Sequence, residues 1–564
     1  MTYYSTYYSQ NNRIFLVDWK GQAHDFCEDL SVTEVKYNIT TQISTLVVKI
    51  SHLNGSSSIL ELPRSEATMN PLPALVKYGL SVANVQIYAV TISEILMDLE
   101  KSAPISYVHS KQGFCTINDT KIFLSAETQT PLGISRHTDY EKLKPKGDFK
   151  SWRNGALSFF ADRAETSLAV AMGASAPVAS LLETAGVLEE SVLWGLVGPS
   201  SRSKTTILKL SASVWGVPST KGLISTLLDT ENYLIGMLTM QDGHPVFIDE
   251  SSVSSSDFTK LIYNLAMSCG RGRCNPDGTL KPIKRWAACS VTVTGERSML
   301  SQSNNNGGLF SRIVEFDRVW AKDAATSEQI SEFVTHQHGT AGPVFIEHLL
   351  NISLSDLKEQ YISNIKSLKM CVTPKNGIEE RILKKLALLR LTIQIMHDAW
   401  DIPVDIDSID NILIETFSLN APKADRYESI YESLLQYVSS HENQFPDEKS
   451  LKTPALAKIA KQGMTSKYNH QACVWIMSDF FEKFLSDRGL EPTNSTLHTM
   501  KDRKMIVHFK DRFRKKQELS PDKGILCYCL LLSNSAPSST TTKKKKKTTK
   551  SKNRHILLSE DNDD

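Results

Sequence analysis

The sequence predicts an α/β core built on a parallel β-sheet, and three apolar runs at similar intervals support this prediction. The first run, residues 191–197, leads into a serine-rich turn and then into a segment that we expect to be helical. The second run, 245–249, ends in acidic residues, and the third, 286–294, ends in a threonine. Short apolar runs of this kind are typical of buried parallel strands. Because open α/β sheets bind ligands at the carboxyl ends of their strands, the site should lie where these runs end.

A phosphate-binding loop is predicted directly after the first run. In the pattern Gly-x4-Gly-Lys-Ser/Thr, backbone N–H groups surround phosphates, the lysine reaches the outer phosphates and the hydroxyl binds Mg²⁺. The chain has this pattern with one exception, because Ser203 stands where the pattern has its second glycine. An ordinary helix start, capped by a serine of the turn, is the alternative interpretation. The candidate phosphate-binding residues are Gly198, Pro199, Ser200, Ser201, Arg202, Ser203, Lys204, Thr205 and Thr206.

The acidic end of the second run supplies residue types that nucleotide hydrolysis requires. Asp249 is predicted to hold Mg²⁺ together with the hydroxyl of Thr205. The next residue, Glu250, is then placed to polarise an attacking water molecule. The alternative is a strand that ends in a solvated acidic turn, because residues 251–257 have the composition of a loop.

Two further residues are candidates for contact with the terminal phosphate. Thr294 ends the strand that we expect beside the acidic strand. There it would contact the terminal phosphate or orient the attacking water. The alternative is a β-branched strand residue without a chemical role. Arg312 follows a loop rich in asparagine and glycine, and an arginine supplied across a subunit interface can reach the γ-phosphate. A salt-bridged strand residue is the alternative for Arg312.

A basic turn lies between the second and third runs. Arg271 and Arg273 stand beside glycines between two cysteines. Arginines in such a turn suit contact with the phosphates of a nucleotide or of nucleic acid. A solvated basic turn with no role is the alternative interpretation.

Further blocks of sequence accompany these motifs in a fixed order. They are the loop with residues 213–216, then 245–250, 270–273, 286–296 and 308–312, preceded by 63–65, 79–81, 113–114 and 149–152. With these blocks, residues from about 90 to 345 resemble the bacterial domain of unknown function 927 family, helicase-like P-loop proteins common on mobile elements. The blocks at 63–65, 79–81, 113–114 and 149–152 resemble the amino-terminal portion of that family. The resemblance implies a RecA- or AAA-like P-loop NTPase core that uses ATP and Mg²⁺ for work on nucleic acid. The family usually carries glycine at the position of Ser203, a departure that bears on hydrolysis more than on binding, because serine tolerates a positive φ poorly.

We assign this P-loop core to residues 149–345 and predict four further regions around it. Residues 1–148 alternate apolar and polar residues as strands do and should form an α+β domain. Residues 346–424 carry amphipathic helices, which we interpret as a lid against the nucleotide site or as a spacer without nucleotide contact. Residues 425–533 have the order of elements of a winged helix, and residues 534–564 form a lysine-rich tail that we expect to be solvated.

Some elements of the amino-terminal half are specific enough to be checked. Strands are expected at 13–17, 43–50 and 121–124, and a helix at 85–99. Residues 149–188 should be helical and apolar, with a helix end near Gly186, and should pack on the P-loop sheet.

The winged-helix prediction depends on three helices and two strands. Helices are expected at 427–440, 471–488 and 493–503, and strands at 505–509 and 525–532. The basic turn between the two strands would lie on a nucleic-acid backbone. The candidate contacts are His498, Lys501, Arg503, Lys504, Lys510, Arg512, Arg514, Lys515 and Lys516. A winged helix that binds protein is the alternative.

The composition limits the function classes without selecting one. The 564 residues carry a formal net charge of +2, so binding to nucleic acid must come from local basic patches. We find no cleavable signal peptide at the polar start, no uninterrupted apolar run of membrane-spanning length, and no zinc-type spacing among the cysteines. A cytoplasmic protein without membrane contact is therefore expected.

The sequence thus predicts a P-loop ATPase that couples ATP binding and hydrolysis to translocation, unwinding or remodelling of single-stranded or duplex DNA, acting as a homo-oligomer. Two alternatives stay open. Ser203 would make the protein a nucleotide-binding switch with impaired hydrolysis, or the P-loop domain would only assemble a DNA-binding initiator or repressor.

Overall fold

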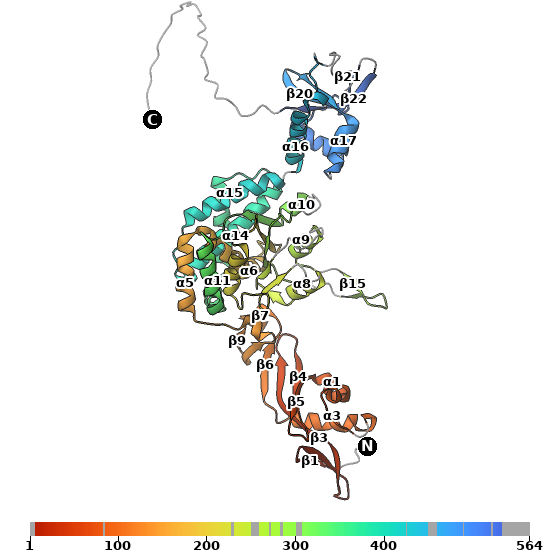
Figure 1. The fold of residues 1–564 in the computed structure, drawn as a ribbon, viewed down its shortest axis with the longest axis vertical. Helices are drawn as coiled ribbons and strands as arrows, with labels where there is room; N and C mark the ends of the chain where they lie inside the picture. Colours follow the sequence, from red (N-terminus) through yellow and green to blue (C-terminus); the bar gives the residue numbers. More distant parts are fainter. Residues whose placement is uncertain are drawn as a thin grey trace, which may run out of the picture. The chain divides into compact units, whose positions relative to one another are not determined.

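The computed structural model divides the chain into two compact units, Met1–Ser429 and Ile430–Asp564, and each is described by itself. Figure 1 labels the helices and strands. The structure describes residues 6–82, 85–226, 231–249, 259–269, 272–281, 286–300, 307–424, 426–448, 450, 460–488, 490–520 and 523–532.

The amino-terminal part of the first unit is an eight-stranded sheet with the order β1-β2-β3-β6-β10-β9, in which β4 and β5 continue from β3. Its strands are β1 (Thr6–Gln10), β2 (Arg13–Val17), β3 (Ala23–Asn38), β4 (Ile43–Ser51), β5 (Ser57–Pro63), β6 (Ile105–His109), β9 (Glu127–Thr130) and β10 (Gly133–His137). The helices α1 (Arg64–Met69), α2 (Leu72–Lys77) and α3 (Val85–Glu100) share a buried apolar core with it. In β4 the alternate residues Leu46, Val48 and Ile50 are buried in this core. The strands predicted at 13–17 and 43–50 and the helix at 85–99 are confirmed.

A small three-stranded sheet joins this part to the core. The strand β8 (Thr120–Leu124), predicted at 121–124, pairs with β7 (Gln112–Ile117), which pairs in parallel with β13 (Gln241–Asp242). Gly113 has φ +92°, and a Cβ atom at this position would lie 1.7 Å from the carbonyl oxygen of Asp242. Glycine is therefore required for the two backbones to approach this closely.

The centre of the first unit is a five-stranded sheet with the order β12-β14-β17-β11-β18. Its strands are β12 (Ile224–Thr226), β14 (Val246–Asp249), β17 (Ser290–Gly295), β11 (Val192–Val197) and β18 (Ile313–Asp317). All four neighbouring pairs are parallel, which confirms the predicted parallel sheet. Every residue of β11 and β17 is buried, as expected of strands covered on both faces.

Helices cover both faces of this sheet, and alternate residues of β11 face opposite sides. Trp194 lies in one apolar core with α6 (Ala164–Thr184) and α7 (Lys204–Ser213). Leu193 lies in a second core with α8 (Glu231–Leu238) and α9 (Thr259–Ala266). The short helices α4 (Tyr140–Leu143) and α10 (Gly307–Phe310) complete this region.

The long helical segment predicted at 149–188 consists of two helices. It divides into α5 (Phe149–Asp162) and α6, because Arg163 between them has an extended backbone with φ −155°. Gly186, with φ +71°, follows the end of α6 as predicted. Among the described helices, α6 is long and apolar enough to cross a membrane by length and composition, although Ser175 and Ser180 interrupt its apolar residues. Its most apolar window is 94% buried inside the protein, as in the core helix of a globular domain.

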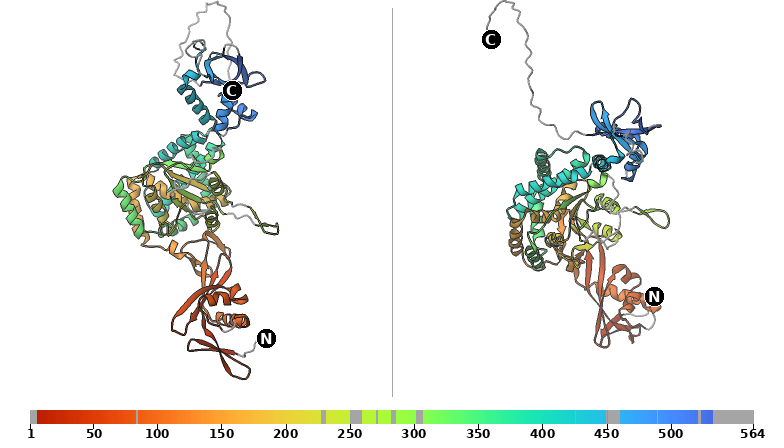
Figure 2. Two further views of the ribbon diagram at one scale, coloured as in Figure 1. Left: turned by 45° about the vertical axis from the view of Figure 1, so that its right-hand side comes forward. Right: turned by 45° about the horizontal axis from the view of Figure 1, so that its top comes forward.

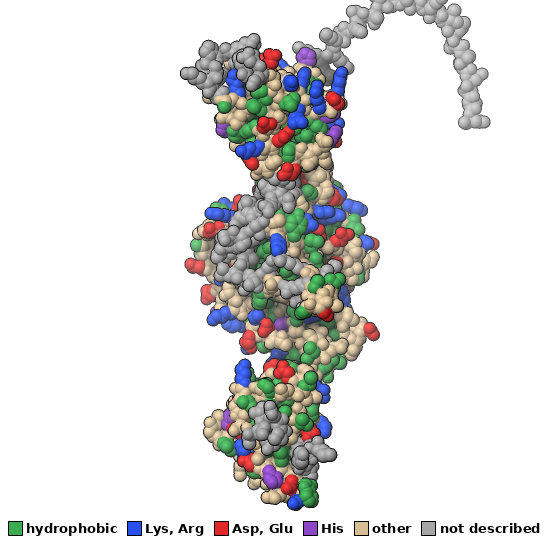
Figure 3. Space-filling model, turned by 90° about the vertical axis from the view of Figure 1, so that its right-hand side faces the viewer, with side chains coloured by type: hydrophobic (Ala, Val, Ile, Leu, Met, Phe, Trp, Pro, Cys, Tyr) green, Lys and Arg blue, Asp and Glu red, His purple; other side chains and the backbone are tan. Residues whose placement is uncertain are grey.

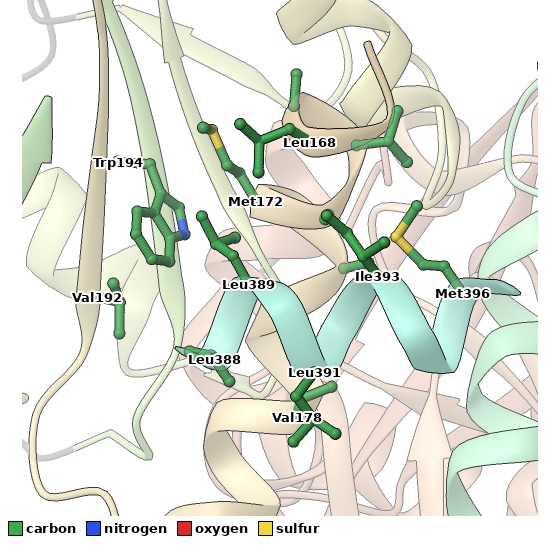
Figure 4. Packing of buried hydrophobic residues seen from close by; sticks show 14 of the residues in the cluster. Leu168, Met172, Val178, Val192, Trp194, Leu388, Leu389, Leu391, Ile393 and Met396 are labelled. Atoms are coloured by element: carbon green, nitrogen blue, oxygen red, sulfur yellow. The ribbon is translucent and has the colours of Figure 1, made fainter. Parts of the chain in front are cut away.

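A group of helices follows the sheet in the described part of the first unit. They are α11 (Ala324–His336), α12 (Ala341–Leu350), α13 (Leu354–Cys371), α14 (Gly377–Trp400) and α15 (Ile406–Ala424). Of these, α12 to α15 pack onto α6, whereas the first, α11, packs on α7 and α5. Figure 4 shows side chains of α14 meeting those of α6, with Leu389 near Met172 and Trp194. Asn376 begins α14 by accepting hydrogen bonds from the backbone N–H groups of Ile378 and Glu379. These helices share the core of the sheet, and their role as a lid stays a prediction.

The second unit contains a four-stranded antiparallel sheet with the order β19-β20-β22-β21. Its strands are β19 (Gly463–Tyr468), β20 (Gln471–Met477), β21 (Arg514–Ser520) and β22 (Lys523–Leu531). The helices are α16 (Arg426–Ser440), the short 3-10 helix η2 (Glu442–Gln444), α17 (Ser478–Asp487) and α18 (Asn494–Asp502). The hydroxyl of Tyr431 on α16 donates to the carbonyl of Leu531 on β22, which ties the first helix to the sheet.

Two predictions in this unit are wrong. Residues 471–488 are not one helix, because Asn469 and His470 have positive φ angles of 48° and 67° and form a two-residue hairpin turn that continues the chain as β20. Residues 505–509 do not form the strand beside β22, and only Ile506 makes an isolated bridge to Leu530. The partner strand is β21, so Arg514 and its two basic neighbours lie on a strand instead of in the turn.

Candidate functional site

The predicted phosphate-binding loop connects β11 to α7 at the carboxyl edge of the central sheet. Gly198 has φ +130°, and a Cβ atom there would lie 2.8 Å from Oδ1 of Asp317. Ser201 and Ser203 have φ angles of 65° and 62°, so the loop turns through the left-handed region twice. Lys204 is the first residue of α7. The loop is thus a strand–turn–helix connection, as the motif requires.

The side chain of Lys204 folds back over the loop. Its Nζ atom donates to the carbonyl oxygens of Gly198 and Pro199, each at 2.8 Å. The ammonium group therefore lies inside the turn, where the motif places a phosphate-binding lysine. Thr205 and Thr206 follow on the first turn of α7.

The structure brings Thr205, Asp249 and Thr294 together. Asp249 ends β14, and Thr294 lies one residue before the end of the neighbouring strand β17. Oδ1 of Asp249 accepts hydrogen bonds from the hydroxyls of Thr205 at 3.0 Å and of Thr294 at 2.5 Å. Three oxygen-bearing side chains from three elements thus meet beside the loop. Oxygen ligands of this kind are those that Mg²⁺ prefers.

Three acidic or hydroxyl side chains that the sequence analysis missed contact the loop. Ser200 donates to Glu296, which follows β17. Arg202 Nη1 lies 2.5 Å from Oδ1 of Asp317 at the end of β18, and the hydroxyls of Ser203 and Ser327 on α11 are 2.5 Å apart. Glu296 and Asp317 come directly at strand ends, a signal that could have identified them. Ser327 lies within a helix, and nothing in the sequence marks it.

Arg312 is not brought to the loop. In β18, Asp317 pairs with Val197 at the carboxyl edge, whereas Arg312 precedes the strand at the amino edge. A five-residue strand separates the two edges by roughly 16 Å. Arg312 therefore does not reach the loop of its own chain, and the predicted role across a subunit interface stays a prediction.

The guanidinium of Arg312 has local partners instead. It donates to the carbonyl of Gly308 at 2.7 Å, lies 3.7 Å from Glu190 and stacks over the ring of Tyr263 at 4.5 Å. Lys385 of α14 donates to its carbonyl oxygen at 2.7 Å, and burial lowers the pKa of this lysine to about 7. These contacts correspond to the structural alternative, a salt-bridged residue at a strand start.

Three candidates lie wholly or partly outside the described residues. Glu250 and Arg271 are not described. Arg273 is described through its backbone only, in the two-stranded hairpin of β15 (Arg273–Cys274) and β16 (Leu280–Lys281), where it pairs with Lys281. Figure 2 shows this hairpin extending away from the central sheet in both views.

The basic candidates of the second unit lie on its surface. Lys501 is in α18, Arg503 caps that helix, and Lys510 and Arg512 lie in the loop before β21. Arg514 begins β21, where its Nη1 lies 3.5 Å from Glu482 on α17. Figure 3 shows lysine and arginine side chains on the visible face of this unit.

Comparisons with known proteins agree with this architecture. Residues 21–285 match the family described as domain of unknown function 927, and residues 425–535 match a Cch helix-turn-helix domain. A solved structure described as SCCmec type IV Cch, an active helicase, covers 93% of this chain and 97% of its own, with 22% identity and a TM-score of 0.72. No curated protein sequence matches. At this identity the likeness establishes a shared fold.

Proposed function

We propose that this protein, which carries the domain of unknown function 927, is an ATPase that couples ATP turnover to translocation on DNA, or to its unwinding or remodelling. Two contacts at the carboxyl edge of a parallel sheet carry the proposal: Lys204 folds over the loop onto the carbonyl of Gly198, and the hydroxyl of Thr205 donates to Asp249. The placement of β17 between β14 and β11 suits the RecA- or AAA-like core. The solved helicase structure with the same fold adds support by analogy.

The residues at the site suit ATP with Mg²⁺. The oxygens of Thr205 and Asp249 would hold the metal, which neutralises charge on the phosphates when it is bound. Lys204 would bind the outer phosphates, and Thr294 would contact the terminal phosphate or orient the water. We assign the polarisation of that water to Glu250.

DNA is the proposed partner because basic residues occur in two separate parts of the chain. One is the second unit, with exposed Arg512 just before β21, exposed Lys516 on β21 and a match to a helix-turn-helix domain. The other is the β15–β16 hairpin, in which Arg273 and Lys281 stand opposite each other. Sequence-tolerant contact with phosphates is the mode that such groups favour. We also propose a homo-oligomer, in which a neighbouring copy completes the site.

Steady-state ATP hydrolysis tests the proposal, measured with and without single-stranded and duplex DNA. We expect DNA-stimulated turnover that Lys204→Ala abolishes through loss of nucleotide binding. Glu250→Gln should bind ATP and stop turnover. Lys209→Ala, on the same helix beyond the loop, is the matched control and should retain activity. Binding of ATP by Lys204→Ala at wild-type affinity would overturn the assignment.

A nucleotide-binding switch with slow hydrolysis is a second candidate, because Ser203 adopts a left-handed conformation where the motif has glycine. Ser203→Gly would then raise hydrolysis sharply. An unchanged rate would show that serine is tolerated and would favour the motor.

A further inference from the structure

The serine that replaces the motif glycine occupies an unfavourable backbone conformation. Ser203 has φ 62° and ψ 25°, which is the left-handed helical region. Glycine adopts this region freely, whereas any residue with a Cβ atom loses free energy there. Some other interaction must hold the loop in this shape.

The hydroxyl of Ser203 supplies a contact that glycine cannot make. Its Oγ lies 2.5 Å from Oγ of Ser327 on α11. The Ser327 hydroxyl also donates to the carbonyl oxygen of Asp323 at 3.2 Å, so its lone pairs are available to accept from Ser203. Asp323 caps α11, accepting from the backbone N–H of Thr326, which fixes this end of the helix.

Two more contacts join the loop to the residues between the end of β18 and the start of α11. Arg202 pairs with Asp317, and the backbone N–H of Trp320 donates to the carbonyl of Arg202 at 3.2 Å. Trp320 is fully buried and its ring lies against Phe316, so the segment between β18 and α11 is anchored in the core. We call Asp317, Trp320 and Ser327 the loop brace.

We propose that Ser327 is a positioning residue, which acts through Ser203 to hold the loop in its phosphate-binding shape. This inference rests on the proposed function, because it assumes that the loop binds ATP. The hydrogen bond compensates for the conformational strain at Ser203. A loop with glycine at position 203 has no such strain and does not need the bond.

A double-mutant cycle tests the coupling. The variants are Ser327→Ala, Ser203→Gly and their combination, and the measurement is the equilibrium dissociation constant for ATP together with kcat and KM. Loss of one hydrogen bond that supports the binding conformation should weaken ATP binding about fivefold. The hydrogen bond between Ser203 and Ser327 supports the loop equally in the ATP complex and in the transition state. KM for ATP should therefore rise while kcat stays within about twofold.

The same substitution should have little effect when residue 203 is glycine, less than about twofold. Ser327→Thr, which keeps a hydroxyl, should restore wild-type binding. Ser331→Ala, one turn further along α11, is the matched control and should bind ATP as the wild type does. Ser203→Ala removes the same hydrogen bond from its other side. Combining it with Ser327→Ala should therefore weaken ATP binding no further than Ser203→Ala alone.

Other outcomes distinguish a failure of the positioning role of Ser327 from a failure of the proposed ATPase function. An effect of Ser327→Ala that is equal in both backgrounds, or absent in both, overturns the positioning role. Additive losses for Ser203→Ala and Ser327→Ala overturn it as well. Lys204→Ala is measured in parallel, and wild-type ATP binding by that variant would instead reject the proposed function.

Discussion

Replacing Asp249 by asparagine tests the metal-binding part of the site with little change in shape. In the structure, Oδ1 of Asp249 accepts from Thr205 and Thr294, and the asparagine carbonyl oxygen can accept both hydrogen bonds. The loop should therefore keep its conformation. The property that changes is the negative charge, which a neutral amide does not supply to Mg²⁺.

The expected loss of Mg²⁺-dependent ATP affinity follows from the net free energy of one charge-assisted contact, about 1.5–3 kcal/mol. Removing it should reduce the Mg²⁺-dependent gain in ATP affinity by roughly 10- to 100-fold. Affinity measured without Mg²⁺ should stay near that of the wild type. Titration of a fluorescent ATP analogue, with Mg²⁺ and with a chelator, gives both quantities for each variant.

Asp317→Asn is the matched control, because Asp317 also lies at a strand end beside the loop but pairs with Arg202. Its substitution should change ATP affinity by a similar factor with and without Mg²⁺. If Asp249→Asn retains the full response to Mg²⁺, or if both variants respond alike, Asp249 does not hold the metal and our reasoning fails.

Three further predictions address stability and DNA binding. Leu389→Ala removes a fully buried side chain between α14, α6 and β11 and should lower the free energy of unfolding by about 2–5 kcal/mol, measured by denaturant titration; a loss below 1 kcal/mol would contradict the packing in Figure 4. Burial lowers the pKa of His109 to about 4 from an ordinary value near 6.5, so the unfolded state takes up the proton first as the pH falls. Stability that is fully present above about pH 6.5 should therefore be lost towards pH 4, by roughly 3 kcal/mol from this residue, and His109→Gln should flatten the profile. Arg512→Ala and Lys516→Ala should each weaken DNA binding similarly for all sequences and reduce the salt dependence by about one counterion, and unchanged salt slopes would exclude phosphate contact.

Much of the candidate site could be predicted because its chemistry lies at strand ends. Parallel strands in one sheet present their carboxyl ends at the same edge, so the sequence predicts Asp249 and Thr294 beside the loop, and the structure places their side-chain oxygens 2.5 Å apart. The turn after β11 was equally visible, since glycine, serine and lysine occupy its positions in sequence.

The positions of other residues could not be predicted from the sequence, because they depend on strand register and on helix packing. Arg312 follows a loop in the sequence, but the parallel register of β18 with β11 puts the start of that strand at the opposite edge from the nucleotide loop. Ser327 is one of many serines, and only the packing of α11 beside α7 brings it to Ser203. In the second unit, the positive φ angles of Asn469 and His470 form a hairpin that hydrophobic periodicity alone did not indicate.

Three features follow from the amino-acid sequence alone: the parallel sheet, the loop after its first strand, and the residue types beside that loop. These depend on local composition and on the rule that parallel strands end together. The edge of the sheet at which Arg312 lies, and the side chains that contact the loop, depend on the tertiary fold. The tertiary structure also placed the apolar helix α6 in the core, where 94% of its most apolar window is buried. Contacts between residues distant in sequence depend on register and helix packing, and these arise from the whole fold instead of from any single segment.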